Sequence, residues 1–206
     1  AGELRSAGEF VPILEKLGLI RLLDLRALEL AAQDLRRHPD IALAVNVSSM
    51  TVIDPSWMRT LVSLVKGSRS IAERLTIEIT ETAALEDFDV TARFIGTVRE
   101  LGCKVALDDF GSGYTSFRHM KSLTVDVVKI DGAFITDIAN NPDNQLFVRT
   151  LLGLAEGFGL KTVAECIESE EDAAILTKEG ADFLQGWHLG RPDTTPDWRK
   201  APPLTP

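Results

Sequence analysis

Two adjacent acidic residues, Asp108 and Asp109, end an apolar run and are followed by the glycine-broken loop Gly111-Ser112-Gly113. Neighbouring residues of a strand point to opposite faces of a sheet. At the last residue of a strand the backbone turns, and both carboxylates can then be aimed into the space above the sheet. Such paired oxygens are ligands that Mg²⁺ and Mn²⁺ prefer. The alternative is that Asp109 caps a following helix while Asp108 is solvated, and the pair alone leaves both interpretations open.

The composition indicates one domain that does not bind a nucleic-acid polymer. The chain has 206 residues, 45% of them hydrophobic, which is enough for one sizeable core. Its net charge of −9 argues against a basic nucleic-acid groove, so a phosphate ester would require metal ions here. Two cysteines without metal-ligand spacing favour a reducing compartment. We therefore expect a cytoplasmic domain. The chain begins without Met, as if cut from a longer one, so the domain is expected to be either free or the cytoplasmic part of a larger membrane-bound protein.

Apolar strand patterns alternate with amphipathic helix patterns along the chain. We expect strands at residues 41–47, 75–80, 104–108, 125–130, 161–165 and 181–185. The helices are expected at residues 10–17, 20–37, 54–66, 87–101, 117–122, 144–158 and 169–179. This alternation predicts an α/β fold with a parallel sheet and right-handed crossovers. The expected domain covers residues 1–192, and the proline-rich residues 193–206 form a tail.

Each expected strand has a metal-binding or proton-handling side chain at or near its carboxyl end. In order, these are Asn46, Glu78, Asp108 with Asp109, Lys129, Glu165 and Gln185. Helix capping does not explain this set, because Glu, Gln and Lys are poor N-caps. A doubly wound sheet would scatter the side chains, whereas a closed (β/α)8 barrel brings them together on one face. A barrel of this kind has eight strands, so we expect the chain to lack two strands at its N-terminal end.

The expected ligands are all oxygen donors, which selects Mg²⁺ or Mn²⁺ over zinc. A shared carboxylate, for which Asp108 is the best candidate, is typical of two-metal sites with ions roughly 3.5–4 Å apart. Lys129 cannot bind a metal while charged, but it can hold an attacking water and neutralise developing negative charge. The alternative is that Lys129 only forms an ion pair with Asp108 or Asp109.

Six short motifs surround these side chains and follow one another in a fixed order. They are Val45-Asn46-Val47-Ser48, Glu78-Ile79-Thr80-Glu81, Asp108-Asp109-Phe110-Gly111-Ser112-Gly113-Tyr114, Lys129-Ile130-Asp131, Ala164-Glu165-Cys166-Ile167-Glu168 and Gln185-Gly186. In order and spacing they resemble the motifs of EAL domains, which are bacterial cyclic di-GMP phosphodiesterases. The resemblance implies a (β/α)8-like barrel whose first strand is antiparallel to the others. It also implies two-metal hydrolysis of cyclic di-GMP to the linear dinucleotide pGpG.

The resemblance also assigns roles by position. It implies that Lys129 holds the nucleophilic water, that Gln185 and Arg191 line the substrate site, and that Glu168 supports the site. Glu81 would steady the loop that contains Gly111, Ser112 and Gly113, although capping or surface roles remain open for Glu81 and Glu168. The implied ligands of two Mg²⁺ or Mn²⁺ ions are Asn46, Glu78, Asp108, Asp109 and Glu165, with Asp109, Lys129 and Glu165 central to catalysis.

The implied partners are cyclic di-GMP, a second copy bound through the 110–122 loop region, and fused sensory or GGDEF-type domains. The sequence also departs from the family. The tripeptide Glu-Ala-Leu, which supplies a further ligand, occurs nowhere in the chain, and Cys166 stands where the family usually has glycine. The segment Trp187–Gly190 also differs from the family pattern. A chain without the first two strands is expected to be inactive alone or to borrow strands from a partner.

Two other functions remain open from the sequence. The missing Glu-Ala-Leu motif is compatible with a receptor that binds cyclic di-GMP without hydrolysing it. A barrel enzyme that stabilises an enolate on Mg²⁺ would share the acidic strand ends, but that reading leaves the 108–114 motif unexplained.

Overall fold

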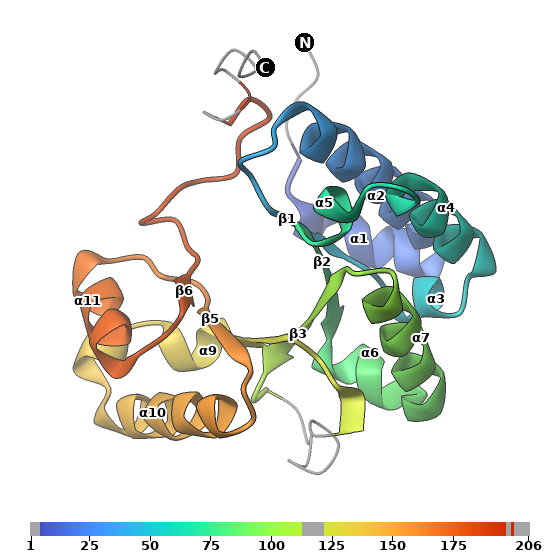
Figure 1. Ribbon diagram of the computed structural model, residues 1–206. Coiled ribbons are helices and arrows are strands. Elements are labelled where there is room, and N and C mark those ends of the chain that lie inside the picture. The colour runs from blue at the N-terminus through green and yellow to red at the C-terminus, as the bar shows by residue number, and fades with distance from the viewer. Residues whose placement is uncertain (1–4, 113–121, 197–198, 200–206) are drawn as a thin grey trace.

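The computed structural model describes residues 5–112, 122–196 and 199. Its centre is one parallel sheet of six strands in which neighbours in sequence are neighbours in space. The strands follow a curve with the helices on its outer side (Figure 1), so the sheet forms half of a barrel. The strands are β1 (Leu43–Asn46), β2 (Leu75–Thr80), β3 (Lys104–Phe110), β4 (Val127–Ile130), β5 (Lys161–Ala164) and β6 (Phe183–Leu184). The predicted parallel α/β fold of barrel type is confirmed.

The long predicted helices are present, and several begin or end at a residue suited to that position. Asp54 accepts a hydrogen bond from the Ser56 N–H (2.8 Å) at the start of α4 (Pro55–Val65), and Gly180 ends α11 (Glu170–Glu179) with a φ of +94°. The helices around the right side of Figure 1 are α1 (Ala7–Lys16), α2 (Ile20–Arg37), α3 (Ser49–Val52), α4 (Pro55–Val65), α5 (Arg69–Ala72), α6 (Glu81–Glu86) and α7 (Phe88–Glu100). Those on the left are α9 (Gly132–Ile135), α10 (Pro142–Gly157) and α11 (Glu170–Glu179), with the 3-10 turn η1 (Ile138–Asn140) before α10.

The structure differs from the predicted elements at several points. The short helices α3, α5, α6 and α9 and the turn η1 were not predicted, because hydrophobic periodicity does not show over so few residues. Strands β1, β4 and β6 are shorter than the predicted ranges 41–47, 125–130 and 181–185. The predicted strand 104–108 continues through Asp109 to Phe110. The predicted helix 117–122 falls almost wholly outside the described residues.

The outer face of the sheet forms the hydrophobic core. On the strands, Ile77, Leu107 and Val128 alternate with the inward-pointing residues and are at most 2% exposed. They pack against apolar side chains of the surrounding helices, including Leu28, Leu35, Trp57, Leu61, Ile95, Val98, Leu152 and Leu176. Each such aliphatic side chain contributes about 1.5–3 kcal/mol by leaving water. This packing leaves the inward-pointing strand positions free for polar residues.

None of the helices in the described ranges combines the length and the apolarity needed to cross a lipid bilayer.

Asp182 connects the beginnings of β5 and β6. Its carboxylate accepts hydrogen bonds from Lys161 Nζ (2.6 Å), the Thr162 N–H (2.9 Å) and Thr162 Oγ1 (3.0 Å). The bond from Lys161, together with those from Thr162, holds the pKa of Asp182 below its usual value despite partial burial. This carboxylate therefore stabilises the edge of the sheet in its ionised form.

We expect Asp182→Asn to lower the free energy of unfolding by about 1–2 kcal/mol at pH 7. Because the pKa is lower in the folded state, the stabilisation is complete above the pKa of the unfolded carboxyl group, about 4, and is lost as the pH falls through the folded value. Urea unfolding at pH 7 and at pH 3 measures the difference in stability between the two proteins, which should be smaller at the lower pH. Asp40→Asn, in an exposed turn, is the control; an Asp182→Asn effect independent of pH would contradict the prediction.

Candidate metal centre

Lys129 lies at the centre of a group of buried carboxylates at the carboxyl ends of the strands. Its Nζ lies 2.6 Å from Glu165 Oε1, 2.9 Å from Asp108 Oδ1 and 3.0 Å from Glu78 Oε2. The residue is only 3% exposed. Three carboxylates around one ammonium leave an excess of negative charge when all are ionised, which is an arrangement that favours a further cation.

Burial and charge act in opposite directions on these groups. Burial lowers the pKa of Lys129, but the carboxylates of Glu78, Glu165 and Asp108 outweigh it and raise that pKa above its ordinary value. Burial raises the pKa of Glu78 and of Glu165, and the Lys129 ammonium opposes the rise only in part. Lys129 is therefore charged at neutral pH, and its charge favours the ionised forms of Glu78 and Glu165.

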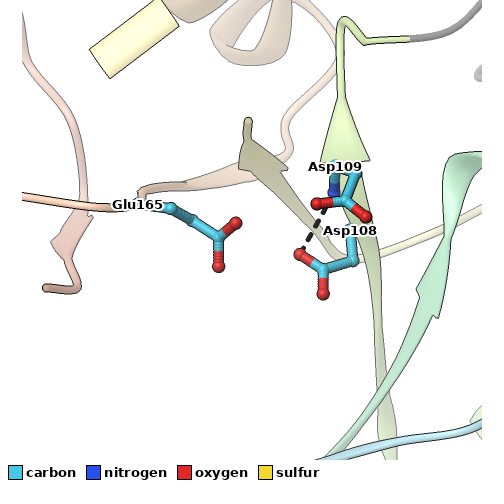
Figure 2. Close-up of side chains that lie close together, drawn as sticks. All are labelled: Asp108, Asp109 and Glu165. Carbon is cyan, nitrogen blue, oxygen red and sulfur yellow. Dashed lines mark hydrogen bonds between the residues drawn. The ribbon is translucent and has the colours of Figure 1, made fainter. Parts of the chain in front are cut away.

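A bulge in β3 brings the two adjacent aspartates to the same side of the sheet. Leu107 pairs with Val128 and Phe110 with Ile130, so β3 contains one more residue than β4 over this interval. The extra residue allows Asp109 to adopt a φ of +55°, and its N–H donates to Asp108 Oδ1 (3.1 Å). Figure 2 shows both carboxylates on the side that faces Glu165. The turn expected after Asp108 is thus a bulge within a longer strand.

Asp108, Asp109 and Glu165 form the acidic group best placed to hold a metal ion. Each offers one carboxylate oxygen, and these oxygens all lie within 4.8 Å of one another (Figure 2). Burial, followed by the negative charges of Asp108 and Asp131, raises the pKa of Asp109, so a bound cation would relieve this repulsion. The donor set is carboxylate oxygen, which fits a hard divalent cation such as Mg²⁺, Mn²⁺ or Ca²⁺.

The structure also places the other expected ligands at this end of the sheet. Glu78 is joined to the group through Lys129, and Asn46 on β1 is directly opposite Glu78 in the strand register. Asn46 is exposed and lies on the wall of a neighbouring cavity of about 700 Å³. Lys129 therefore pairs with Asp108, as one reading of the sequence proposed, but it also contacts two further carboxylates.

The loop after β3 is attached to Glu81 at the start of α6. Glu81 is 1% exposed, and its Oε2 accepts a hydrogen bond from the Gly111 N–H (2.9 Å). Ser112 Oγ donates to the Asp109 carbonyl oxygen (2.7 Å). Gly111 has a φ of +100°, and a Cβ there would lie 3.1 Å from the Phe134 ring. Gly113 lies outside the described residues, as does most of the segment in which dimer contacts were expected.

A cavity of about 550 Å³ opens beside Glu165. Gln185, Glu168 and Arg191 all line it, together with Cys166, Gly186, Trp187, Gly190 and Pro192. The Arg191 guanidinium lies 5.0 Å from the centre of the exposed Trp187 ring. The cavity thus adjoins the acidic group and offers both a cation and an aromatic face to a ligand.

Gly186 is a site residue that was not predicted. A Cβ at this position would lie 2.7 Å from the carbonyl carbon of Ile167 and closer still to its N and O atoms. The absence of a side chain lets the backbones meet: the Ile167 N–H donates to the Gln185 carbonyl (3.1 Å), and the His188 N–H donates to the Ile167 carbonyl (3.0 Å). Its place next to Gln185 in the last motif was a signal that could have identified it.

Comparison with known proteins shows similarity in both sequence and architecture. A family model described as "EAL domain" matches residues 1–192. The chain is 30% identical over 200 residues to the probable cyclic di-GMP phosphodiesterase PdeA of Escherichia coli, covering 95% of this chain and 27% of that protein. It is 31% identical to the bifunctional diguanylate cyclase/cyclic di-GMP phosphodiesterase MucR of Pseudomonas aeruginosa, covering 92% of this chain and 28% of that protein.

A solved structure extends this similarity to three dimensions. The PaMucR phosphodiesterase in complex with c-di-GMP superposes with a TM-score of 0.84 at 31% identity, covering 91% of this chain and 78% of that chain. The present chain spans about a quarter of the length of the two curated relatives. The match to the family model, which extends over most of the sequence, establishes that the chain belongs to the EAL domain family.

Proposed function

We propose that this domain hydrolyses one phosphodiester bond of cyclic di-GMP to give linear pGpG. The observation that carries the proposal is the convergence of Asp108, Asp109 and Glu165, two of which contact Lys129, beside a cavity of about 550 Å³. An excess of negative charge next to a ligand-sized cavity suits a phosphate ester only when cations are present. The names of the two relatives and the ligand in the solved complex support cyclic di-GMP as the substrate.

The proposed cofactors are two Mg²⁺ or Mn²⁺ ions. Bound ions of this kind neutralise charge on the phosphate and lower the pKa of a water molecule. Oxygen donors and the absence of His or Cys from the expected ligand set support these ions over zinc. The proposed ligands are Asn46, Glu78, Asp108, Asp109 and Glu165.

The remaining site residues would bind and orient the reactants. The buried Lys129 ammonium is placed to hold the attacking water by a hydrogen bond and to stabilise negative charge that develops on the phosphate. Gln185 and Arg191 would contact the substrate from the cavity wall, and Glu168 would support the wall at the same rim. Glu81, through its bond to Gly111, would fix the loop containing Ser112 and Gly113 relative to the metal ligands.

A cyclic di-GMP receptor without hydrolytic activity is the second candidate. The observation that favours it is the absence of a Glu-Ala-Leu tripeptide from the 206 residues. The retention of all the other expected ligands favours the enzyme.

The proposal for the wider protein rests on the relatives. A fused GGDEF-type or sensory domain is supported by the bifunctional name of MucR and by the short span of the chain relative to it. We also propose a homodimer formed through the 110–122 loop region, a domain boundary at residue 192 followed by a tail, and a cytoplasmic location. Two free cysteines, Cys103 and Cys166, support a reducing compartment.

The activity prediction concerns Glu165. In the full-length protein that contains this chain, cyclic di-GMP incubated with Mn²⁺ should yield pGpG, and EDTA should abolish the product. Glu165→Gln removes one ligand charge and one ion pair of Lys129 while keeping the shape of the side chain, so we expect the rate to fall at least about 100-fold. Chromatography of the nucleotide products measures the rate.

Glu170→Gln, an exposed acid in the first turn of α11, is the matched control and should leave the rate within about twofold of the parent. Tight binding of cyclic di-GMP that is unaffected by EDTA, with no pGpG formed, would refute the enzyme and support the receptor.

A prediction about stability concerns the charge of Lys129. Lys129→Met leaves Glu78, Asp108 and Glu165 without their compensating cation, so we expect the free energy of unfolding in EDTA to fall by about 3–5 kcal/mol at pH 7. Burial then keeps the pKa of Glu78 and of Glu165 above the unfolded values, so the folded state of the variant binds more protons. Its stability should therefore rise as the pH falls from 7 towards about 5.

Urea unfolding of the variant across this pH range measures the effect. Lys104→Met, at the exposed beginning of β3, is the control and should change stability by less than about 1 kcal/mol. If Lys129→Met lost the same stability at every pH, uncompensated carboxylates would not be the cause.

A further inference from the structure

Gly132, the first residue of α9, lies directly against Cys166 in the loop after β5. A Cβ added to Gly132 would lie 2.7 Å from the Cys166 Cβ and closer still to its Sγ. Real Cβ atoms do not approach one another so closely. Gly132 is not among the residues with positive φ, so its backbone would accept alanine. Space, rather than conformation, requires glycine at this position.

The Cys166 side chain cannot relieve this contact by rotation alone. Rotation about χ1 moves Sγ but leaves Cβ in place, and the Cβ distance is itself too short for an added atom. The backbone of Cys166 has a φ of +53°, a left-handed conformation that glycine adopts more readily than other residues. A side chain at Gly132 would therefore displace the backbone at Cys166.

The next residue of the same loop is also closely packed. Gly186 meets the backbone of Ile167, which is fully buried and hydrogen-bonded to Gln185 and His188. Two consecutive residues of this loop, Cys166 and Ile167, thus each lie against a glycine from a different part of the chain. Neither contact leaves room for a Cβ on the glycine.

We propose that Gly132 is a positioning residue for Glu165, because its missing side chain leaves the space that Cys166 occupies and so fixes the loop after β5. Glu165 immediately precedes Cys166, and its Oε1 lies 2.6 Å from Lys129 Nζ. Its carboxylate also lies within 4.8 Å of those of Asp108 and Asp109. A backbone shift at Cys166 would therefore move Glu165 relative to both groups. The part of this inference that concerns metal binding rests on the proposed function.

A double-mutant cycle tests the proposal. It compares four proteins: the parent, which has the unchanged sequence, the variants Gly132→Ala and Cys166→Gly, and the double variant with both changes. We expect Gly132→Ala to lower the Tm in EDTA by about 2–10 °C through overpacking, and to weaken Mn²⁺ binding in calorimetric titration at least about tenfold. Cys166→Gly removes the Cβ and Sγ atoms with which an added Cβ at Gly132 would collide. The double variant should therefore match Cys166→Gly, within about 2 °C in Tm and about threefold in Mn²⁺ affinity.

Gly153→Ala is the matched control. Gly153 lies within α10, and a Cβ there would have nothing within 4 Å, so alanine should leave the Tm unchanged or slightly raised and Mn²⁺ binding unchanged. The proposal is overturned if Gly132→Ala has the Tm and the Mn²⁺ affinity of the parent. It is also overturned if the double variant shows the same loss of Tm and of Mn²⁺ affinity as Gly132→Ala.

Two further outcomes remain informative. If Gly132→Ala does not fold, the comparison of the double variant with Cys166→Gly tests the proposal. Equal Tm values of these two proteins support a steric contact between Gly132 and Cys166, and failure of the double variant to fold refutes it. If the parent binds no Mn²⁺, the proposed metal site fails and positioning for metal binding fails with it, while the Tm cycle still decides the steric pairing.

Discussion

The Lys129 ammonium contacts three carboxylates, and its positive charge opposes the effect of burial on two of them, Glu78 and Glu165. Burial raises the pKa of Glu78 and Glu165, and Lys129 is the nearest positive charge that opposes the rise. The ammonium in turn is buried and keeps its proton because the carboxylates surround it. Buried ion clusters of this type contribute little net stability, so the main effect of this one is to hold several acidic side chains in fixed positions relative to one another.

That arrangement requires the geometry of the parallel half-barrel. Parallel strands place their carboxyl ends at one edge, and curvature turns the inward-pointing side chains of β2, β3, β4 and β5 towards one another. A flat sheet would hold Glu78 and Glu165, which are three strands apart, too far from each other to share Lys129. The apolar outer face supports the curvature, because the helices packed on it cover the convex side.

The strands and the polar residues at their ends could be predicted from sequence because both are local patterns. Val105, Ala106 and Leu107 identify a buried strand, and the acids follow at once. The bulge at Asp109 could not be predicted, since it depends on how β3 pairs with β4 some 20 residues away. Gly132 and Gly186 were missed for the same reason: each is required by a segment that is distant in sequence. Local periodicity contains no information about such contacts.

The positions of individual oxygen atoms explain how an ammonium and a divalent cation can use the same acids. Lys129 contacts Oε2 of Glu78, Oδ1 of Asp108 and Oε1 of Glu165, which is one oxygen of each carboxylate. An ionised carboxylate accepts at both oxygens, so each of these acids retains a second oxygen for a cation. Lys129 and the proposed metal ions are therefore not competitors. The ammonium orients the carboxylates in advance, and this reduces the reorganisation needed when cations bind.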